Sequence, residues 1–216
     1  MGVAYNASMI AEPIYHYFDY KSPYAFLAQE DTLLLESQHG LRVKWCPYTL
    51  DIPSYLGNAA LNEGGEDVVG TRNAHQWRRV RYSYMDCRRE ANRRGLTIRG
   101  PKKIFDSSVA HMGFLYVAKQ GDFGPYHNLV FTRFWRRELD IEDRNALQAL
   151  MLETGYDPQG FEQYCLTMGG LELGEVQKLA EDKGVFGVPS YVYRNELYWG
   201  LERLPRLLEA VAADGQ

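Results

Sequence analysis

Cysteine is scarce in this chain of 216 residues, and its spacing suggests no disulfide framework. The three cysteines, Cys46, Cys87 and Cys165, are an odd number, lie far apart and include no C-x-x-C pair. Stable disulfides are rare in compartments that keep thiols reduced. We therefore expect a cytoplasmic protein.

Long apolar runs are also lacking, because none approaches the roughly 18–20 residues that a membrane-spanning helix needs. The opening stretch MGVAYNASMIAEP has no basic start followed by apolar residues, so it does not resemble a secretory signal, and we expect a short mobile lead-in. The five histidines show no metal-ligand spacing. The sequence therefore predicts neither a membrane partner nor a metal site.

Positive charge is not in excess, since the net charge is −4. This balance excludes the whole molecule as an electrostatic partner for nucleic acid or for an acidic membrane face. Basic residues gather between 78 and 103, but no nucleic-acid-binding motif accompanies them, and we expect most to be solvated. An apolar content of 45% and a charged content of 24% fit one large domain, or a small domain with a sizeable insertion.

Two short β-prone stretches flank a helix near the start of the chain. Residues 13–19 (PIYHYFD) and 41–46 (LRVKWC) are predicted strands. Between them, Ser22 provides a helix N-cap and Pro23 the first helical residue, and the helix is expected to end near Gln38. This β-α-β order implies a right-handed crossover and a parallel strand pair.

Strand signals disappear after residue 51 and return only near the end. Apolar residues at steps of three and four predict a helix over 75–95, with further helices over 108–120, 126–136, 142–153, 158–168 and 173–183. Residues 189–193 and 196–199 are predicted strands joined by a hairpin turn, before a last helix over 202–212. The predicted fold class is α/β, a thioredoxin-like domain over 13–50 and 171–214 (β-α-β … α-β-β-α) with an all-helical insertion domain over 51–170.

Two motifs resemble a known family. YFDYKSPYAFLA (17–28) resembles the opening of the 2-hydroxychromene-2-carboxylate isomerases and kappa-class glutathione transferases, and GVFGVPSYVYRNELYWGLERL (184–204) resembles their cis-proline segment, hairpin and helix start. These proteins share the DsbA-like fold of the periplasmic disulfide oxidoreductases but carry serine in place of the first cysteine. The resemblance, weaker elsewhere, covers nearly the whole chain and implies glutathione as the cofactor and a homodimer as the assembly.

Ser22 is the catalytic residue that this resemblance implies. A free thiol has a pKa of about 8.5, so little of it is ionised at neutral pH. The positive end of a helix and a hydrogen bond from the Ser22 hydroxyl would together favour the thiolate of glutathione. The alternative is that Ser22 only caps the helix. Pro23 and Tyr24 leave no resolving cysteine beside Ser22, which argues against a dithiol oxidoreductase.

The rest of the predicted glutathione site lies in the C-terminal motif. A cis bond before Pro189 would let Val188 bind the cysteinyl amide as a short added strand, whereas the alternative is an ordinary trans proline. By resemblance, the turn at Leu201 binds the γ-glutamyl end, with its ammonium group on Glu202. The alternative is that Glu202 binds no ligand and is only a first-turn acid that interacts favourably with the helix dipole. The predicted cofactor-binding residues are Ser22, Val188, Pro189, Trp199, Gly200, Leu201 and Glu202.

Substrate contacts are predicted by position in the family. Trp45 and Pro47 match its Trp-x-Pro element, and Arg79 and Tyr82 fall near its Lys and Tyr. The family's Asn-Gln-Pro-Pro element is absent, and Asn73 is the one candidate to replace it. Cys46 is expected to be inert packing. Lys21 departs from the apolar or small residue of the family, and either senses an anion or is solvated.

These features predict a glutathione-dependent isomerase of an aromatic-degradation intermediate such as 2-hydroxychromene-2-carboxylate. The thiolate would add reversibly to an activated double bond, so glutathione would not be consumed. Two alternatives remain: a kappa-like glutathione transferase that conjugates an electrophile, and a non-catalytic peptide-binding module. The expected partners are a small-molecule substrate and a second copy of the chain, with no nucleic acid and no membrane.

Overall fold

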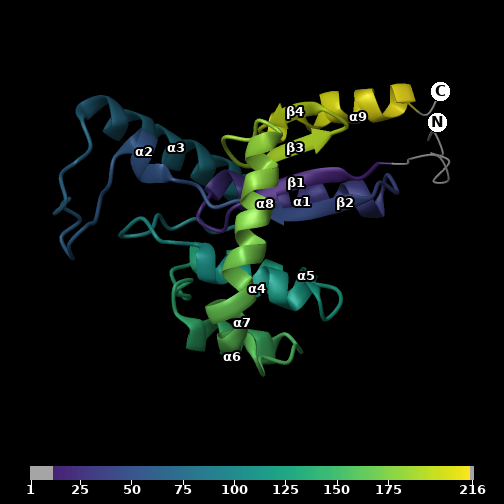
Figure 1. Ribbon diagram of the computed structural model, residues 1–216. Coiled ribbons are helices and arrows are strands. Elements are labelled where there is room, and N and C mark those ends of the chain that lie inside the picture. The colour runs from purple at the N-terminus through teal and green to yellow at the C-terminus, as the bar shows by residue number, and fades with distance from the viewer. Residues whose placement is uncertain (1–11, 215–216) are drawn as a thin grey trace. The chain divides into compact units, whose positions relative to one another are not determined.

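A computed structural model describes residues 12–214, so the predicted lead-in lies outside the described residues. The chain forms two compact units (Figure 1). Of the described residues, 12–48 and 175–214 form the sheet unit, and Thr49–Gly174 form the helical unit. Within residues 12–214, no helix combines the length and apolar character needed to cross a membrane.

The sheet unit contains four strands in the order β2-β1-β3-β4. β1 pairs in parallel with β2 and antiparallel with β3, and β3 pairs antiparallel with β4. This topology confirms the predicted thioredoxin-like fold, with β-α-β first and a β-hairpin near the end. The bounds are β1 Ile14–Phe18, α1 Pro23–Ser37, β2 Val43–Pro47, β3 Ser190–Tyr193, β4 Glu196–Trp199, the 3₁₀ turn η2 Leu201–Arg203 and α9 Leu204–Asp214.

Side-chain alternation along the strands divides the sheet into two faces. On one face, the hydroxyl groups of Tyr191 in β3 and Thr32 in α1 lie 2.8 Å apart, so α1 covers that face. His16 and Trp45 share this face, because His16 pairs with Tyr191 and with Trp45 in the strand register. Cys46 alternates to the opposite face and is also buried. The sheet is therefore packed on both sides, as its aromatic strands predict.

The helical unit builds its own core around large buried side chains, among them Trp135, Tyr126 and Phe131. Its structure departs from the all-helical prediction at its start, where two isolated β-bridges occur, Ala60 with Lys103 and Leu61 with Asp67. A short helix, α2, was also missed because five residues carry too little periodicity to detect. The helices are α2 Ile52–Leu56, α3 Ala74–Arg93, α4 Ser108–Ala118, α5 Gly124–Trp135, α6 Arg144–Glu153 and α7 Phe161–Tyr164.

The prediction of separate helices over 158–168 and 173–183 is wrong, because the chain stays helical between them. α7 continues into a π-helical turn, η1 (Cys165–Gly169), and then into α8 (Gly170–Asp182). The glycine pair suggested a break, but Gly169 is needed for close packing. A Cβ at Gly169 would lie 2.8 Å from the Met112 sulfur and 3.0 Å from the Tyr164 ring.

The two adjacent glycines should therefore respond oppositely to alanine. Gly169→Ala is expected to lower the free energy of unfolding by about 1–3 kcal/mol through overpacking. A Cβ at Gly170 meets nothing within 4 Å and the residue has helical φ of −66°, so Gly170→Ala should raise stability by up to about 1 kcal/mol. Denaturant unfolding of both variants measures this, and equal effects would contradict the packing explanation.

His16 is an ionisable residue that is fully buried in the sheet. Its ring centroid lies 4.7 Å from that of Tyr191 and 4.7 Å from that of Trp45, and the side chain is fully buried. Burial lowers the pKa of His16 to about 3. The nearby Ser190 backbone opposes this lowering in part, although it does not form a full hydrogen bond with the ring. His16 is therefore a neutral core residue near pH 7.

Because His16 is buried in its neutral form, the free energy of unfolding should decrease as the pH is lowered. Because the folded pKa is about 3 and the ordinary value 6.5, the unfolded chain binds more protons below pH 6.5. This stabilisation is complete above pH 6.5, and between pH 7 and pH 5 about 2 kcal/mol of it should be lost. Unfolding curves at both pH values measure this loss. His16→Gln should flatten the dependence, whereas the control His75→Gln, at an exposed position, should keep the slope.

Candidate functional site

Ser22 begins α1 as the sequence predicted. Its backbone is extended, Pro23 follows as the first helical residue, and the Ser22 Oγ accepts a 3.2 Å hydrogen bond from the Ala25 N–H. Ser22 therefore lies where unpaired N–H groups and the helix dipole favour an anion. Its side chain is buried, so a charge placed against the hydroxyl would be poorly screened by water.

The structure brings Ser22 and the C-terminal motif together. The Ser22 hydroxyl lies 3.5 Å from the carbonyl oxygen of Val188, across 166 residues of sequence. The Val188–Pro189 peptide bond is cis, as predicted. A donor–acceptor distance of 3.5 Å makes a weak hydrogen bond, so both the hydroxyl and the carbonyl have capacity for a better partner. No backbone partner of the Val188 N–H is recorded among residues 12–214.

Gly200 joins this corner from the end of β4. Its N–H donates a 2.9 Å hydrogen bond to the carbonyl of Pro189, and its φ of 101° lies in the region that favours glycine. A Cβ at Gly200 would collide with the carboxylate of Glu202, which folds back over this residue. Leu201 and Glu202 belong to η2, which contacts α1. The predicted γ-glutamyl turn thus lies against the helix that Ser22 begins.

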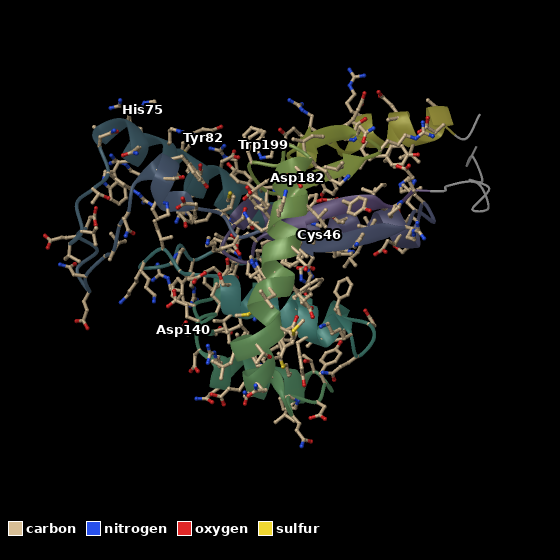
Figure 2. All side chains as sticks on the ribbon, viewed as in Figure 1. Cys46, His75, Tyr82, Asp140, Asp182 and Trp199 are labelled. Carbon is tan, nitrogen blue, oxygen red and sulfur yellow. The ribbon has the colours of Figure 1, made fainter. Side chains whose placement is uncertain are left out.

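Trp199 is half-exposed at the end of β4 (Figure 2). Its ring centroid lies 4.8 Å from that of Phe186, whose side chain is 60% exposed. A Cβ at Gly187 would lie 2.8 Å from the indole nitrogen of Trp199, so glycine is needed there. Phe186 was missed in the sequence, although its place two residues before Val188 is a usable signal. The two rings form an exposed aromatic pair beside the cis-proline segment.

Lys21 is buried, which removes the solvated alternative. Its ammonium nitrogen lies 3.5 Å from a carboxylate oxygen of Asp19, and the two side chains are 5% and 0% exposed. The other carboxylate oxygen of Asp19 accepts a 3.0 Å hydrogen bond from the Lys21 N–H. The role of Asp19 was not predicted from the sequence, although an acid two residues before an unexpected lysine is a usable signal.

Trp45 and Pro47 both lie on β2 and are buried. Pro47 pairs with Phe18, the last residue of β1, shortly before Ser22. The Trp45 indole instead donates a 3.4 Å hydrogen bond to Glu36, near the end of α1. Glu36 follows Ser22 by about 20 Å along the helix axis. Cys46 is buried, and burial raises its pKa to about 12, so it stays protonated at neutral pH. The geometry thus fits packing for Trp45 and inert packing for Cys46.

Arg79 and Tyr82 belong to α3 of the helical unit and are exposed there. Figure 2 labels Tyr82 on this helix. The structure does not bring them together with Ser22 in one unit, and their substrate contacts stay a prediction. Asn73 is the N-cap of α3, forming a reciprocal capping box with Gln76, which accounts for asparagine at that position. Within residues 12–214, no cluster of His, Cys, Asp and Glu could hold a metal ion.

The fold and the serine-headed site are those of a thioredoxin-type protein, and comparison with known families agrees. The model of the DSBA-like thioredoxin domain matches residues 14–212, so the chain belongs to that family. Within the family, the chain is a distant homologue of proteins named 2-hydroxychromene-2-carboxylate isomerase. The relative from Pseudomonas putida is 28% identical over 198 residues, covering 90% of this chain and 92% of its own. The relative from Sphingobium xenophagum is 25% identical over 189 residues, covering 87% and 92%.

Solved structures show the same fold. A 2-hydroxychromene-2-carboxylate isomerase aligns with a TM-score of 0.72 at 23% identity, covering 94% of this chain and 95% of its own. The cytosolic disulfide reductase DsbM from Pseudomonas aeruginosa, solved with GSH, aligns with a TM-score of 0.60 at 14% identity, covering 94% and 100%.

Proposed function

We propose that this protein is a glutathione-dependent isomerase that acts on an aromatic-degradation intermediate of the 2-hydroxychromene-2-carboxylate type. The single observation that carries the proposal is the buried Ser22 hydroxyl at the start of α1, 3.5 Å from the Val188 carbonyl. The homologues named for this reaction supply the substrate class.

Glutathione binding would use the hydrogen-bonding capacity of this corner. As an extended peptide, its cysteinyl residue would pair with the N–H and carbonyl of Val188, like a strand added to the sheet. The Ser22 hydroxyl would then turn from the Val188 carbonyl toward the sulfur, while still accepting from the Ala25 N–H. The γ-glutamyl group would lie at Gly200 and Leu201, with its ammonium group near the exposed carboxylate of Glu202.

The reaction needs a thiolate that adds to an activated double bond. Bound glutathione would supply that thiolate, and its reversible addition and later expulsion would allow rotation about the former double bond and leave glutathione unconsumed. The contribution of the protein is to keep the sulfur ionised and close to the acceptor carbon.

Removing the hydroxyl should lower turnover. A hydrogen bond to a charged group contributes about 1.5–3 kcal/mol, so Ser22→Ala should reduce kcat/KM by roughly tenfold to a hundredfold. Isomerisation of 2-hydroxychromene-2-carboxylate with added glutathione, followed by absorbance, measures this. The control Ser37→Ala removes a hydroxyl from the exposed end of the same helix and should leave the rate unchanged.

Helix capping can be separated from chemistry with Ser22→Gly. Glycine keeps most of the capping preference, whereas alanine costs about 1 kcal/mol of stability. Both variants should lose activity equally, although only Ser22→Ala should be clearly less stable to denaturant. Wild-type rates in either folded variant would remove Ser22 from the chemistry.

The transferase alternative differs in what happens to glutathione. An isomerase regenerates it, so many product molecules should form while the free thiol concentration stays constant. Thiol titration of the reaction mixture alongside product absorbance measures this ratio. Loss of one thiol per product would overturn the isomerase and establish conjugation. Calorimetric titration that detects no glutathione binding would favour the peptide-binding module.

A further inference from the structure

The turn between β1 and α1 contains a buried ion pair that the proposed function does not yet use. The side chains of Lys21 and Asp19 are 5% and 0% exposed, and the charged groups lie 3.5 Å apart. Removing two ions from water costs several kcal/mol each, and their attraction often does no more than offset this cost. An apolar residue at position 21 would pack here without that cost, so stability alone gives no reason for the lysine.

Asp19 fixes the chain that leads into Ser22. One carboxylate oxygen accepts the Lys21 N–H, the other faces the Lys21 ammonium, and the Asp19 carbonyl accepts the Ser22 N–H at 3.0 Å. Consecutive Cα atoms are about 3.8 Å apart, so the residue that carries the ammonium group is a direct neighbour of Ser22. A single aspartate thus orders both the lysine and the serine.

The ammonium group has hydrogen-bonding capacity to spare. It carries three donors, and among the described residues its recorded ion-pair partner is Asp19. A buried donor without an acceptor is costly, whereas an anion bound at Ser22 would provide one. The positive charge is therefore carried by the residue directly before Ser22, at which the proposed sulfur would bind.

Among the described residues, the other buried titratable groups of β1, β2 and β3 supply no positive charge. His16 on β1 is neutral, Cys46 on β2 is kept protonated by its raised pKa of about 12, and burial also raises the pKa of Tyr48 after β2. The tyrosines Tyr17 on β1 and Tyr191 on β3 likewise have pKa values raised by burial. On η2, which contacts α1, the carboxylate of Glu202 and the guanidinium of Arg203 are both exposed. Without Lys21, the negative charge of Asp19, buried shortly before Ser22, would oppose a thiolate.

We propose that Lys21, held in place by Asp19, is a positioning residue that keeps the sulfur of bound glutathione ionised at Ser22. This inference rests on the proposed function, because it concerns the cofactor of that site. In this arrangement Lys21 supplies the positive charge, and Asp19 holds the lysine in place. An opposite charge within about 4–6 Å lowers an acid's pKa by 1–3 units, which is the size of effect expected here.

The experiment titrates the thiolate of glutathione bound to the intact protein, by its ultraviolet absorbance. Lys21→Met keeps the apolar stem and should raise the pKa of the bound thiol by about one unit or more, a tenfold loss of thiolate below that pKa. Lys21→Gln is a second neutral variant, and Lys21→Arg should restore the wild-type thiol pKa. The same substitution at the exposed Lys44 of β2, Lys44→Met, is the matched control and should change nothing.

Asp19→Asn tests the two roles separately. The amide oxygen can still accept the Lys21 N–H, but the negative charge is gone, so the pKa of the bound thiol should fall. A structural role alone predicts that neutralising either partner weakens glutathione binding without moving the thiol pKa.

Two results would overturn the inference: a wild-type thiol pKa in folded Lys21→Met and Lys21→Gln, or a rise in Asp19→Asn equal to that in Lys21→Met. Failure of the proposed function is distinct, because wild-type protein would then bind no glutathione, or bind it with the thiol pKa of the free tripeptide.

Discussion

The hydroxyl of Ser22 is one of the points at which the N-terminal and C-terminal segments of the sheet unit meet. It accepts from the Ala25 N–H of its own helix and reaches the Val188 carbonyl from the far end of the chain. This contact depends on the antiparallel pairing of β1 with β3, since that pairing places the segment before β3 beside the segment after β1. The sheet is therefore what turns a helix cap into a candidate catalytic group.

Burial sorts the ionisable groups of this unit into uncharged and charged sets. His16 and Cys46 are buried, and desolvation outweighs the other influences on both: the low pKa of His16 and the high pKa of Cys46 keep both side chains neutral near pH 7. Lys21 and Asp19 are enclosed as an ion pair, directly before Ser22. Among the described residues of this core, buried charge is thus confined to this pair, directly before the proposed glutathione site.

Much of the sheet unit was predictable because its signals are local. The strands, the N-cap at Ser22 and the hairpin at Arg194 follow from residue types within a few positions of each other. In the helical unit, the same rules failed at Gly169, where the glycine serves a contact with Met112 and the helix continues. The contacts between α4 and η1 join segments far apart in the sequence, so no short stretch of residues predicts them.

The sequence by itself determined the order of strands and helices, the serine at the head of α1 and the proline after Val188. Each of these depends on local backbone preferences, which can be predicted from the types of neighbouring residues. Tertiary structure alone decided that Lys21 is buried against Asp19, that Phe186 packs on Trp199, and that the Trp45 indole bonds to Glu36. Those contacts depend on which side chains are buried against one another, and this is determined only when the elements of the fold pack together.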